Sequence, residues 1–323
     1  MFILHVGAGK CGSSALQHHF SNNPVVDTNM GVLAYHVLSS NGILSGSKLT
    51  EKASKDPRGY VSSQNFKRIH RYNFKDQLSQ LLKNDINLFS AEGWINEGGK
   101  QEAVDLISQF PEPVHIVMFV RPQVPVMNSS YWQWGAWADE EFEHWVNERI
   151  KAVQWYNKYS QFLSIDNVSE VKVKILGTDI VDDFKSAFSL HYDRVDNESP
   201  LYNKSLNIDV LRLMQKYRNL RKDPHDSSVD FIISKFFGDL LVGGAPWVLD
   251  EGLIRRIQDK CRKGNKLLLD VVSDSDKEKM LSDERWWQFF DVKSPLVDPL
   301  PQENLEFSYE KLFVRALEVL ANK

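Results

Sequence analysis

Short apolar runs alternate with amphipathic stretches along the N-terminal part of the chain. The runs Phe2–Val6, Ile86–Ser90 and Val114–Val120 are rich in β-branched and aromatic residues, as are strands buried on both faces. Gly31–Tyr35 and Val171–Leu176 are two further short strands in the same series. Between these runs the apolar residues recur at helical spacing. This alternation predicts an α/β fold with a central parallel sheet flanked by helices.

The helices between the strands are predicted from apolar positions three and four residues apart. They are Phe66–Asn84, Gln101–Phe110, Val124–Ala138, Glu141–Leu163 and Asp182–Leu190. Beyond Leu206 the pattern is mostly helical, with helices expected near Asp209–Leu220, Val229–Leu241, Leu253–Leu269 and Tyr309–Leu320. We therefore expect residues 1–205 to form the α/β core and 206–323 to be a helical part that completes the same domain and shapes its cleft.

One stretch lacks the alternation. Asn41–Ser63 is rich in Ser, Gly, Lys and Asp and has few apolar residues. We predict a long surface loop here, and long loops in compact domains are often functional.

Composition limits the classes of function. The chain has 323 residues and a net charge of −4, so no overall basic field indicates a nucleic-acid partner. Its two cysteines, Cys11 and Cys261, cannot form a disulfide framework, which favours a reducing compartment. No apolar run is long enough to span a bilayer, and the first strand leaves no room for a signal peptide. We expect a cytoplasmic protein; its oligomeric state stays open.

A glycine-rich turn, Gly7-Ala8-Gly9-Lys10-Cys11-Gly12, follows the first predicted strand directly. Its glycines permit positive φ angles and close approach of the backbone to a ligand. Ser13 and Ser14 are favourable residues for the start of the next helix. A strand, a glycine loop and a helix N-terminus together gather free N–H groups and a positive dipole around an anion. With Lys10 in the turn, the expected anion is a phosphate.

The position of the lysine distinguishes this loop from a Walker A loop. In a Walker A loop the lysine directly follows the second glycine. Here Ser13 occupies that place, and Lys10 stands two residues before Gly12. The sequence also has no clear hydrophobic strand ending in an aspartate that would hold magnesium. Both features count against a P-loop nucleotide kinase or NTPase, which remains the alternative.

A second motif begins where the strand Val114–Val120 ends. Arg121 follows the strand, and Ser129 stands eight residues later on the predicted helix. An arginine at a strand end and a serine on the next helix can hold a second phosphate from two sides, because guanidinium and hydroxyl groups both donate hydrogen bonds to phosphate oxygens.

The order Lys-x-Gly-Ser-Ser resembles the 5′-phosphosulfate loop of the sulfotransferases that use PAPS (3′-phosphoadenosine-5′-phosphosulfate), and the spacing of Arg121 and Ser129 resembles their 3′-phosphate motif. Over Met1–Leu206 the chain is most similar to the bacterial-type members of this family. The resemblance implies a P-loop-like fold, PAPS as donor, PAP as product and no metal. It assigns donor binding to Gly9, Lys10, Cys11, Gly12, Ser13, Ser14, Arg121 and Ser129.

The resemblance also implies a catalytic pair. Lys10 would neutralise the charge that grows on the leaving phosphate, and Glu92 would be the general base because it follows the strand Ile86–Ser90 where the family carries its base. His18 and His19 are alternative bases. The acceptor would be a hydroxyl, or an amine, of a carbohydrate or small polar metabolite. A catalytically inactive nucleotide-binding module is a further alternative.

Several other residues are open to two interpretations. Cys11 is better explained as a loop residue than as a nucleophile, since no His or acid pattern accompanies it. The basic run Lys67–Arg71 fits either an acidic acceptor or a solvated helix face. Asn203 and Ser205 match a segment that approaches the nucleotide in the family. Four aromatic residues at helical spacing fit core packing first and ring stacking second: Tyr131, Trp132, Trp134 and Trp137.

Overall fold

The structure, a computed structural model, describes residues 1–193, 206–221, 223–224, 226, 229–230, 232–233 and 246–300. Three sequence predictions lie wholly or mostly outside these residues: the segment with Asn203 and Ser205, the helix Val229–Leu241 and the helix Tyr309–Leu320.

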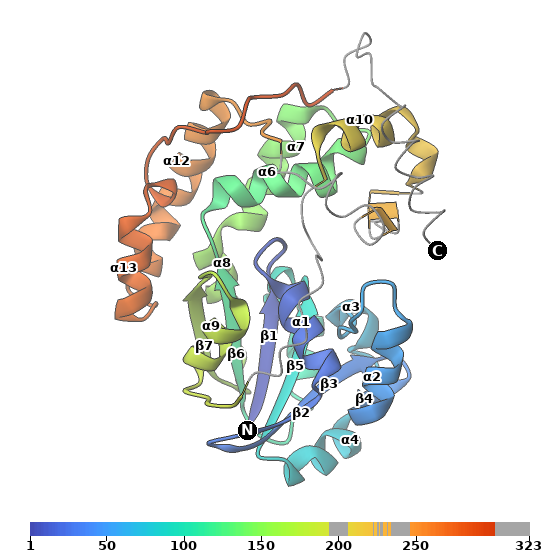
Figure 1. Cartoon of the computed structure of the whole chain (residues 1–323). Helices are drawn as coiled ribbons and strands as arrows, with labels where there is room; N and C mark the ends of the chain where they lie inside the picture. Colours follow the sequence, from blue (N-terminus) through green and yellow to red (C-terminus); the bar gives the residue numbers. More distant parts are fainter. Residues whose placement is uncertain are drawn as a thin grey trace.

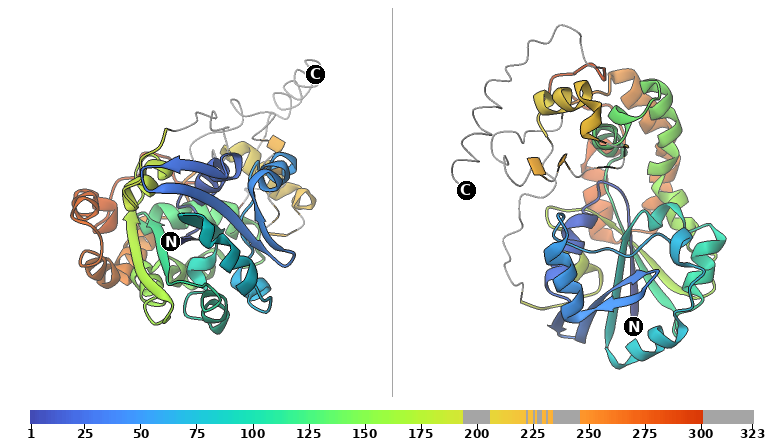
Figure 2. Two further views of the ribbon diagram at one scale, coloured as in Figure 1. Left: turned by 90° about the horizontal axis from the view of Figure 1, so that it is seen from below. Right: turned by 90° about the vertical axis from the view of Figure 1, so that its right-hand side faces the viewer.

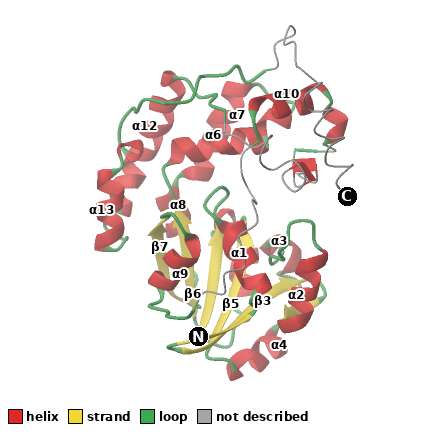
Figure 3. Ribbon diagram, viewed as in Figure 1, coloured by secondary structure: helices red, strands yellow, loops and turns green. Residues whose placement is uncertain are grey.

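The described strands form a seven-stranded, mostly parallel sheet in the order β2-β3-β5-β1-β6-β7, with β4 paired to β3 (Figures 1 and 3). The parallel strands β3, β5, β1, β6 and β7 are the five predicted runs, and β2 and β4 pair antiparallel to β3. The strands span Phe2–Gly7 (β1), Val25–Thr28 (β2), Gly31–Ser39 (β3), Gly42–Ser45 (β4), Ile86–Glu92 (β5), Val114–Val120 (β6) and Val168–Ile175 (β7).

Strand β1 lies in the middle of this sheet, between β5 and β6. All six of its residues are buried, because helices cover both faces of the sheet. Helix α1 (Ser13–Asn22) packs against α2 (Gly46–Lys55) and α9 (Ile180–Ala187), whereas α5 (Gln101–Ile107) packs against α3 (Phe66–Ile69). The right-hand view of Figure 2 shows the sheet edge-on with α1 and α2 on one side and α5 on the other. The predicted α/β class is confirmed.

The helices of the core and the 3-10 turns between them are shorter than the sequence patterns suggested. They are α1 (Ser13–Asn22), α2 (Gly46–Lys55), α3 (Phe66–Ile69), α4 (Lys75–Gln80), η1 (Leu81–Lys83), η2 (Trp94–Asn96), α5 (Gln101–Ile107), α6 (Gln123–Gln133), η3 (Gly135–Trp137), α7 (Phe142–Arg149), η4 (Ile150–Val153), α8 (Trp155–Ser160) and α9 (Ile180–Ala187).

Two long helix predictions were wrong, because polar residues interrupt them. Phe66–Asn84 is broken between α3 and α4, where the Asn73 side chain accepts a hydrogen bond of 3.1 Å from the Lys75 N–H. An Asn that binds the backbone two residues ahead favours a turn over a continuous helix. Glu141–Leu163 is likewise divided into α7, η4 and α8, with Gln154 in a non-helical conformation.

The surface loop predicted for Asn41–Ser63 was also wrong, since the segment contains β4 and α2. Helix α2 buries only Leu49 and Ala53, so its apolar stripe is too narrow to stand out in the sequence. The remainder, from Asp56, is held against α1: the Ser21 hydroxyl accepts a hydrogen bond of 3.0 Å from the Val61 N–H.

The described C-terminal elements are α10 (Ile208–Lys216), η5 (Arg218–Leu220), α12 (Glu251–Leu268), α13 (Asp274–Ser282) and η6 (Glu284–Trp286). Helix α12 packs on α6 and α8, and α13 packs on β7. Figure 1 shows α6, α10 and α12 beyond the end of the sheet toward which the loop after β1 projects. None of the described helices has the length and apolar character needed to cross a bilayer.

Candidate functional site

The loop that joins β1 to α1 has an unusual backbone. Lys10 has a φ angle of 63° and Gly12 one of 84°, so both lie in the left-handed region. The left-handed conformation is unfavourable for a lysine, and backbone strain of this kind is found most often at functional sites. The turn is closed by a 3.2 Å hydrogen bond from the Cys11 N–H to the carbonyl of Ala8.

Helix α1 begins directly after this loop, with Gly12 as its N-cap residue. No side chain caps the helix, and its first turn carries no acidic residue. The Ser13 hydroxyl donates back to the Ala8 carbonyl over 3.3 Å instead of capping. The N–H groups of Ser13 and Ser14 therefore keep their capacity to bind an anion, whereas the Ala15 N–H donates to the Gly12 carbonyl over 3.0 Å.

Two glycines allow other parts of the fold to approach the loop closely. A Cβ atom on Gly9 would lie 2.9 Å from Cη2 of Trp134, and one on Gly12 would lie 2.8 Å from Cδ1 of Ile180. Larger residues at these positions would displace the indole of Trp134 or the side chains of Ile180, the first residue of α9, and Leu176, which follows β7. The loop is thus held between η3 on one side and the β7–α9 connection on the other.

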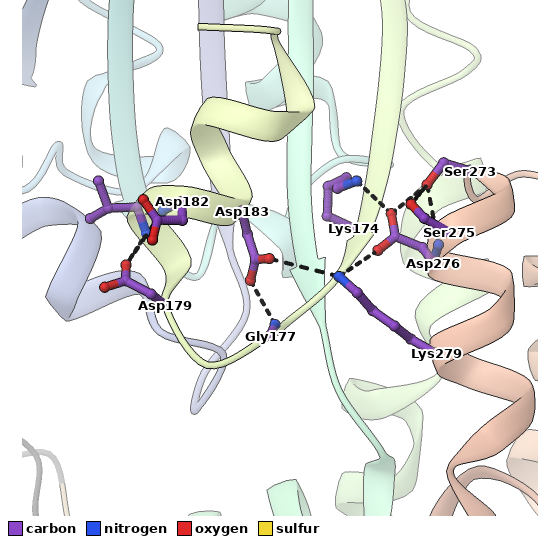
Figure 4. A network of polar contacts seen from close by, with 10 residues as sticks. Lys174, Gly177, Asp179, Asp182, Asp183, Ser273, Ser275, Asp276 and Lys279 are labelled. Atoms are coloured by element: carbon purple, nitrogen blue, oxygen red, sulfur yellow. Dashed lines mark hydrogen bonds and ion pairs between the residues drawn. The ribbon is translucent and has the colours of Figure 1, made fainter. Parts of the chain in front are cut away.

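A network of ion pairs fixes that β7–α9 connection (Figure 4). The Gly177 N–H donates to Asp183 over 2.6 Å, and Lys279 on α13 lies 3.9 Å from the same carboxylate. Lys279 also lies 3.3 Å from Asp276, which is fully buried and pairs with Lys174 of β7 at 2.6 Å. Helix α13 therefore holds in place the connection that packs against the glycine-rich loop.

Glu92 and Arg121 reach the loop from the two strands beside β1. Glu92 ends β5, where it pairs in register with Gly7 of β1. Arg121 follows β6, and its Nη1 donates to the carbonyl oxygen of Lys10 over 3.3 Å. The Arg121 carbonyl accepts a 2.9 Å hydrogen bond from the indole of Trp155, which fixes the backbone there. Three of the predicted site residues thus meet at the carboxyl edge of the sheet.

The charges in this group are incompletely matched. Burial lowers the pKa of Lys10 to about 8, opposed by Glu92 and Asp230 and reinforced by Arg221 and Arg121. Desolvation by the surrounding protein raises the pKa of the Glu92 carboxyl, although Glu92 is exposed at the end of β5. The positive charges of Lys10 and Arg58 oppose this increase. Among the described residues, neither the Lys10 ammonium nor the Glu92 carboxylate has a hydrogen-bond partner or an ion pair within 4.0 Å.

Other candidates fit the site less directly. Burial raises the pKa of Cys11 to about 12, so this residue stays a thiol at neutral pH. The ring of His19 packs against Phe20 and Tyr192, away from the sheet edge. Ser129 is half-buried on α6, and no described hydrogen bond joins it to Arg121. Its role in phosphate binding stays a prediction.

Two site residues that the sequence did not suggest come from the segment after α2. The hydroxyl of Tyr60 donates to Oγ of Ser14 over 3.1 Å, and the Tyr60 side chain is buried. The guanidinium of Arg58 lies 5.1 Å from the centre of the Tyr60 ring and pairs with Asp56 at 2.9 Å. This segment is therefore part of the site, although its sequence is that of a loop.

The opposite wall comes from the C-terminal part and the aromatic group. The buried guanidinium of Arg221 pairs with Asp230, donates to the carbonyl of Gln133 over 2.8 Å and lies 4.5 Å from the ring of Trp137. Trp137, like Tyr131 and Trp132, is a core residue, whereas Trp134 is partly exposed beside the loop. The pairing of Arg221 with Asp230 leaves no recognisable pattern in the sequence, so it could not be predicted from the sequence.

No group of three or more His, Cys, Asp or Glu side chains with metal-binding geometry occurs in the part of the chain that the structure describes.

No protein-family model and no curated protein matches the chain. Among solved structures it is similar to a sulfotransferase from Alicyclobacillus acidocaldarius, with a TM-score of 0.40 and 14% identity over 85% of this chain and 98% of that one. It is also similar to an apo GTPase from Pyrococcus abyssi, with a TM-score of 0.26 and 13% identity over 77% and 88% of the two chains. Similarity this distant carries no argument about function.

Proposed function

We propose that the protein is a PAPS-dependent sulfotransferase that moves a sulfuryl group to a hydroxyl, or an amine, of a carbohydrate or small polar metabolite. The observation that carries the proposal is the meeting of Lys10, Glu92 and Arg121 around an uncapped helix N-terminus. A phosphate cradle, a cation and a neighbouring carboxylate are the groups that this transfer requires.

The donor would bind along the loop edge. Backbone N–H groups of Gly9, Gly12, Ser13 and Ser14 would hold the 5′-phosphosulfate, together with the Lys10 ammonium. The Cys11 N–H, which the family pattern also assigns to the donor, is used inside the loop by its hydrogen bond to the Ala8 carbonyl. Arg121, whose guanidinium already touches the loop backbone, would bind the 3′-phosphate with Ser129. Tyr60 would orient the Ser14 hydroxyl through the hydrogen bond between them.

In the reaction, the acceptor oxygen attacks sulfur in line with the bond that breaks. A new oxygen–sulfur bond forms, the bond from sulfur to the 5′-phosphate oxygen breaks, and that oxygen keeps the electron pair and leaves as part of PAP. Glu92 takes the acceptor proton, and Lys10 balances the negative charge on the departing phosphate. Positioning and electrostatics supply most of the rate, as in phosphoryl transfer.

Calorimetric titration with PAP, against ADP, which also has two phosphates but carries both at the 5′ position, tests the donor. We expect micromolar binding of PAP, much weaker binding of ADP, and about 10-fold to 150-fold loss of PAP affinity in Arg121→Ala, because a charge-assisted hydrogen bond contributes about 1.5–3 kcal/mol. Arg262→Ala, an exposed arginine on α12, is the control and should bind PAP normally.

This titration, together with assays of ATP hydrolysis and of PAP release from PAPS, separates the alternatives. If ADP with magnesium binds as well as PAP, and ATP is hydrolysed, a P-loop kinase or NTPase replaces the sulfotransferase. If PAP binds but no acceptor panel yields PAP from PAPS, the protein is an inactive nucleotide-binding module. If no nucleotide binds, the loop is a general phosphate cradle and the proposal fails.

A further inference from the structure

Two adjoining hollows lie on the surface beside α3, outside the residues assigned to the donor. One has a volume of about 440 Å³ and the other about 670 Å³, and both are lined by His70, Arg71 and Tyr72. Both are open to solvent rather than enclosed. An open, continuous hollow suits an extended ligand that lies along the surface better than a small molecule that must be surrounded.

The hollows carry more basic than acidic side chains on a protein that is acidic overall, and the acids that line them are Glu102 and Asp105. Four exposed cations line them, and we call these the α3 cations: Lys67, Arg68, Arg71 and Lys75. Among the described residues none of the four has an ion pair within 4.0 Å, although exposed lysines and arginines elsewhere do, such as Lys55 with Glu51 and Arg255 with Glu251. A cluster of unmatched cations against a net charge of −4 attracts anions to this part of the surface.

Helix α3 is rigidly joined to the segment that carries Glu92. Phe66, the first residue of α3, stacks on Trp94 with ring centres 4.6 Å apart, and its N–H donates to Glu97 over 2.8 Å. The indole of Trp94 in turn donates to the carbonyl of Gln64 over 2.9 Å. Trp94 follows Glu92 by two residues, so α3, which carries part of the lining of the hollows, packs against the segment that carries the proposed base.

We propose that the hollows beside α3 bind an anionic stretch of the acceptor, a linear glycan that carries carboxylate or sulfate groups. The proposal rests on the proposed sulfotransferase activity, which requires an acceptor hydroxyl at Glu92. The α3 cations bind acid groups on neighbouring sugars. Tyr72, whose side chain is 44% exposed, offers a ring face for a sugar to pack on. A nucleic acid fits less well, since the wider surface has no basic excess.

Binding of polygalacturonate oligomers to the full chain tests this site without turnover. We expect binding that weakens as salt rises, and about tenfold weaker binding in the double variant Lys67→Glu/Arg71→Glu at low salt. The control is Lys263→Glu/Lys266→Glu on α12, where two exposed lysines without described ion pairs undergo the same reversal to Glu. It should bind the oligomers as the unmodified protein does.

Three outcomes would overturn the proposal. Equal loss in the control variant would show that only the net charge matters. Equal binding of neutral dextran would remove the role of the anionic groups, and equal binding of poly-glutamate would show that a sugar backbone is not recognised.

Titration of the Lys67→Glu/Arg71→Glu variant with PAP keeps the two proposals separate. We expect unchanged PAP affinity, because the α3 cations do not belong to the donor site. Loss of polygalacturonate binding with intact PAP binding supports both proposals. Polygalacturonate binding by a protein that does not bind PAP leaves an anion site and removes the sulfotransferase.

Discussion

Two clusters of basic and acidic side chains, one beside the glycine-rich loop after β1 and one beside α13, are built differently. In the α13 cluster (Lys174, Asp183, Asp276, Lys279) every charged group is paired, and Asp276 also accepts a 2.7 Å hydrogen bond from Ser273. In the loop cluster (Lys10, Glu92, Arg121), Lys10 and Glu92 have no described ion pair, and Lys10 lies in the left-handed region.

The difference separates a structural role from a functional one. Burying charges is tolerated when each has partners, and the cost then appears only if one partner is removed. A lysine and a carboxylate that lie near each other without direct contact keep their hydrogen-bonding groups available to a ligand, an arrangement typical of functional sites. The same residue types thus stabilise the fold in one place and are available to bind a ligand in the other.

The largest expected effect is on stability, in the α13 cluster. Asp276→Ala leaves the ammonium of Lys174, whose side chain is 11% exposed, without its partner. We expect the free energy of unfolding to fall by about 3–5 kcal/mol, as for other broken buried pairs, in urea titration. Glu51→Ala removes an exposed pair with Lys55 and should cost less than about 1 kcal/mol. Equal costs would mean that the buried network is not structural.

In the loop cluster we expect a substitution to lower activity and leave stability unchanged. Lys10→Ala should lower kcat about 10²-fold to 10³-fold, the loss measured when one donor to a developing anion is removed. The thermal midpoint of the Lys10→Ala variant should not fall, since the Lys10 ammonium has no described ion pair to lose and burial disfavours its charge. Enzyme assays and melting curves on one preparation check both. A clear loss of stability with unchanged kcat would reverse the two roles.

The protonation of Lys10 gives the site a limit at high pH. Because burial lowers the pKa of Lys10 to about 8, the free enzyme loses this positive charge as the pH rises through that value. We expect kcat/KM for the donor to decline above about pH 8, since kcat/KM reports the ionisation of the free enzyme. A profile that stays flat to the ordinary lysine range would show that Lys10 is not required in its charged form.

The smallest expected effect concerns Arg58. Its positive charge favours the ionised form of Glu92, so Arg58→Gln should raise the pKa of Glu92 and move the acidic limb of the kcat profile to higher pH. A shift of about 0.1–0.7 pH unit corresponds to a partly exposed interaction of 0.2–1 kcal/mol. Arg58→Lys should largely restore the pH of the acidic limb. A fall in kcat of equal size at every pH would indicate that Arg58 has only a structural role.

The loop cluster could be largely anticipated because its residues follow strand ends. Lys10, Glu92 and Arg121 come after three runs that the apolar pattern identified, and parallel strands bring their carboxyl ends together. The α13 cluster could not be anticipated. Helix α13 itself was missed because its few apolar residues give no helical stripe, and Asp276 and Lys279 appear in the sequence as ordinary solvated charges.

By itself, the sequence determined the strand–glycine loop–helix unit and the five runs that become parallel strands, because these depend on the conformational preferences of neighbouring residues and on apolar periodicity. Only the tertiary structure decided what surrounds the loop. Tyr60 meets Ser14 across 46 residues, and Arg221 pairs with Asp230 beside Trp137. Such contacts depend on how the whole core packs, and no local pattern of residues encodes that arrangement.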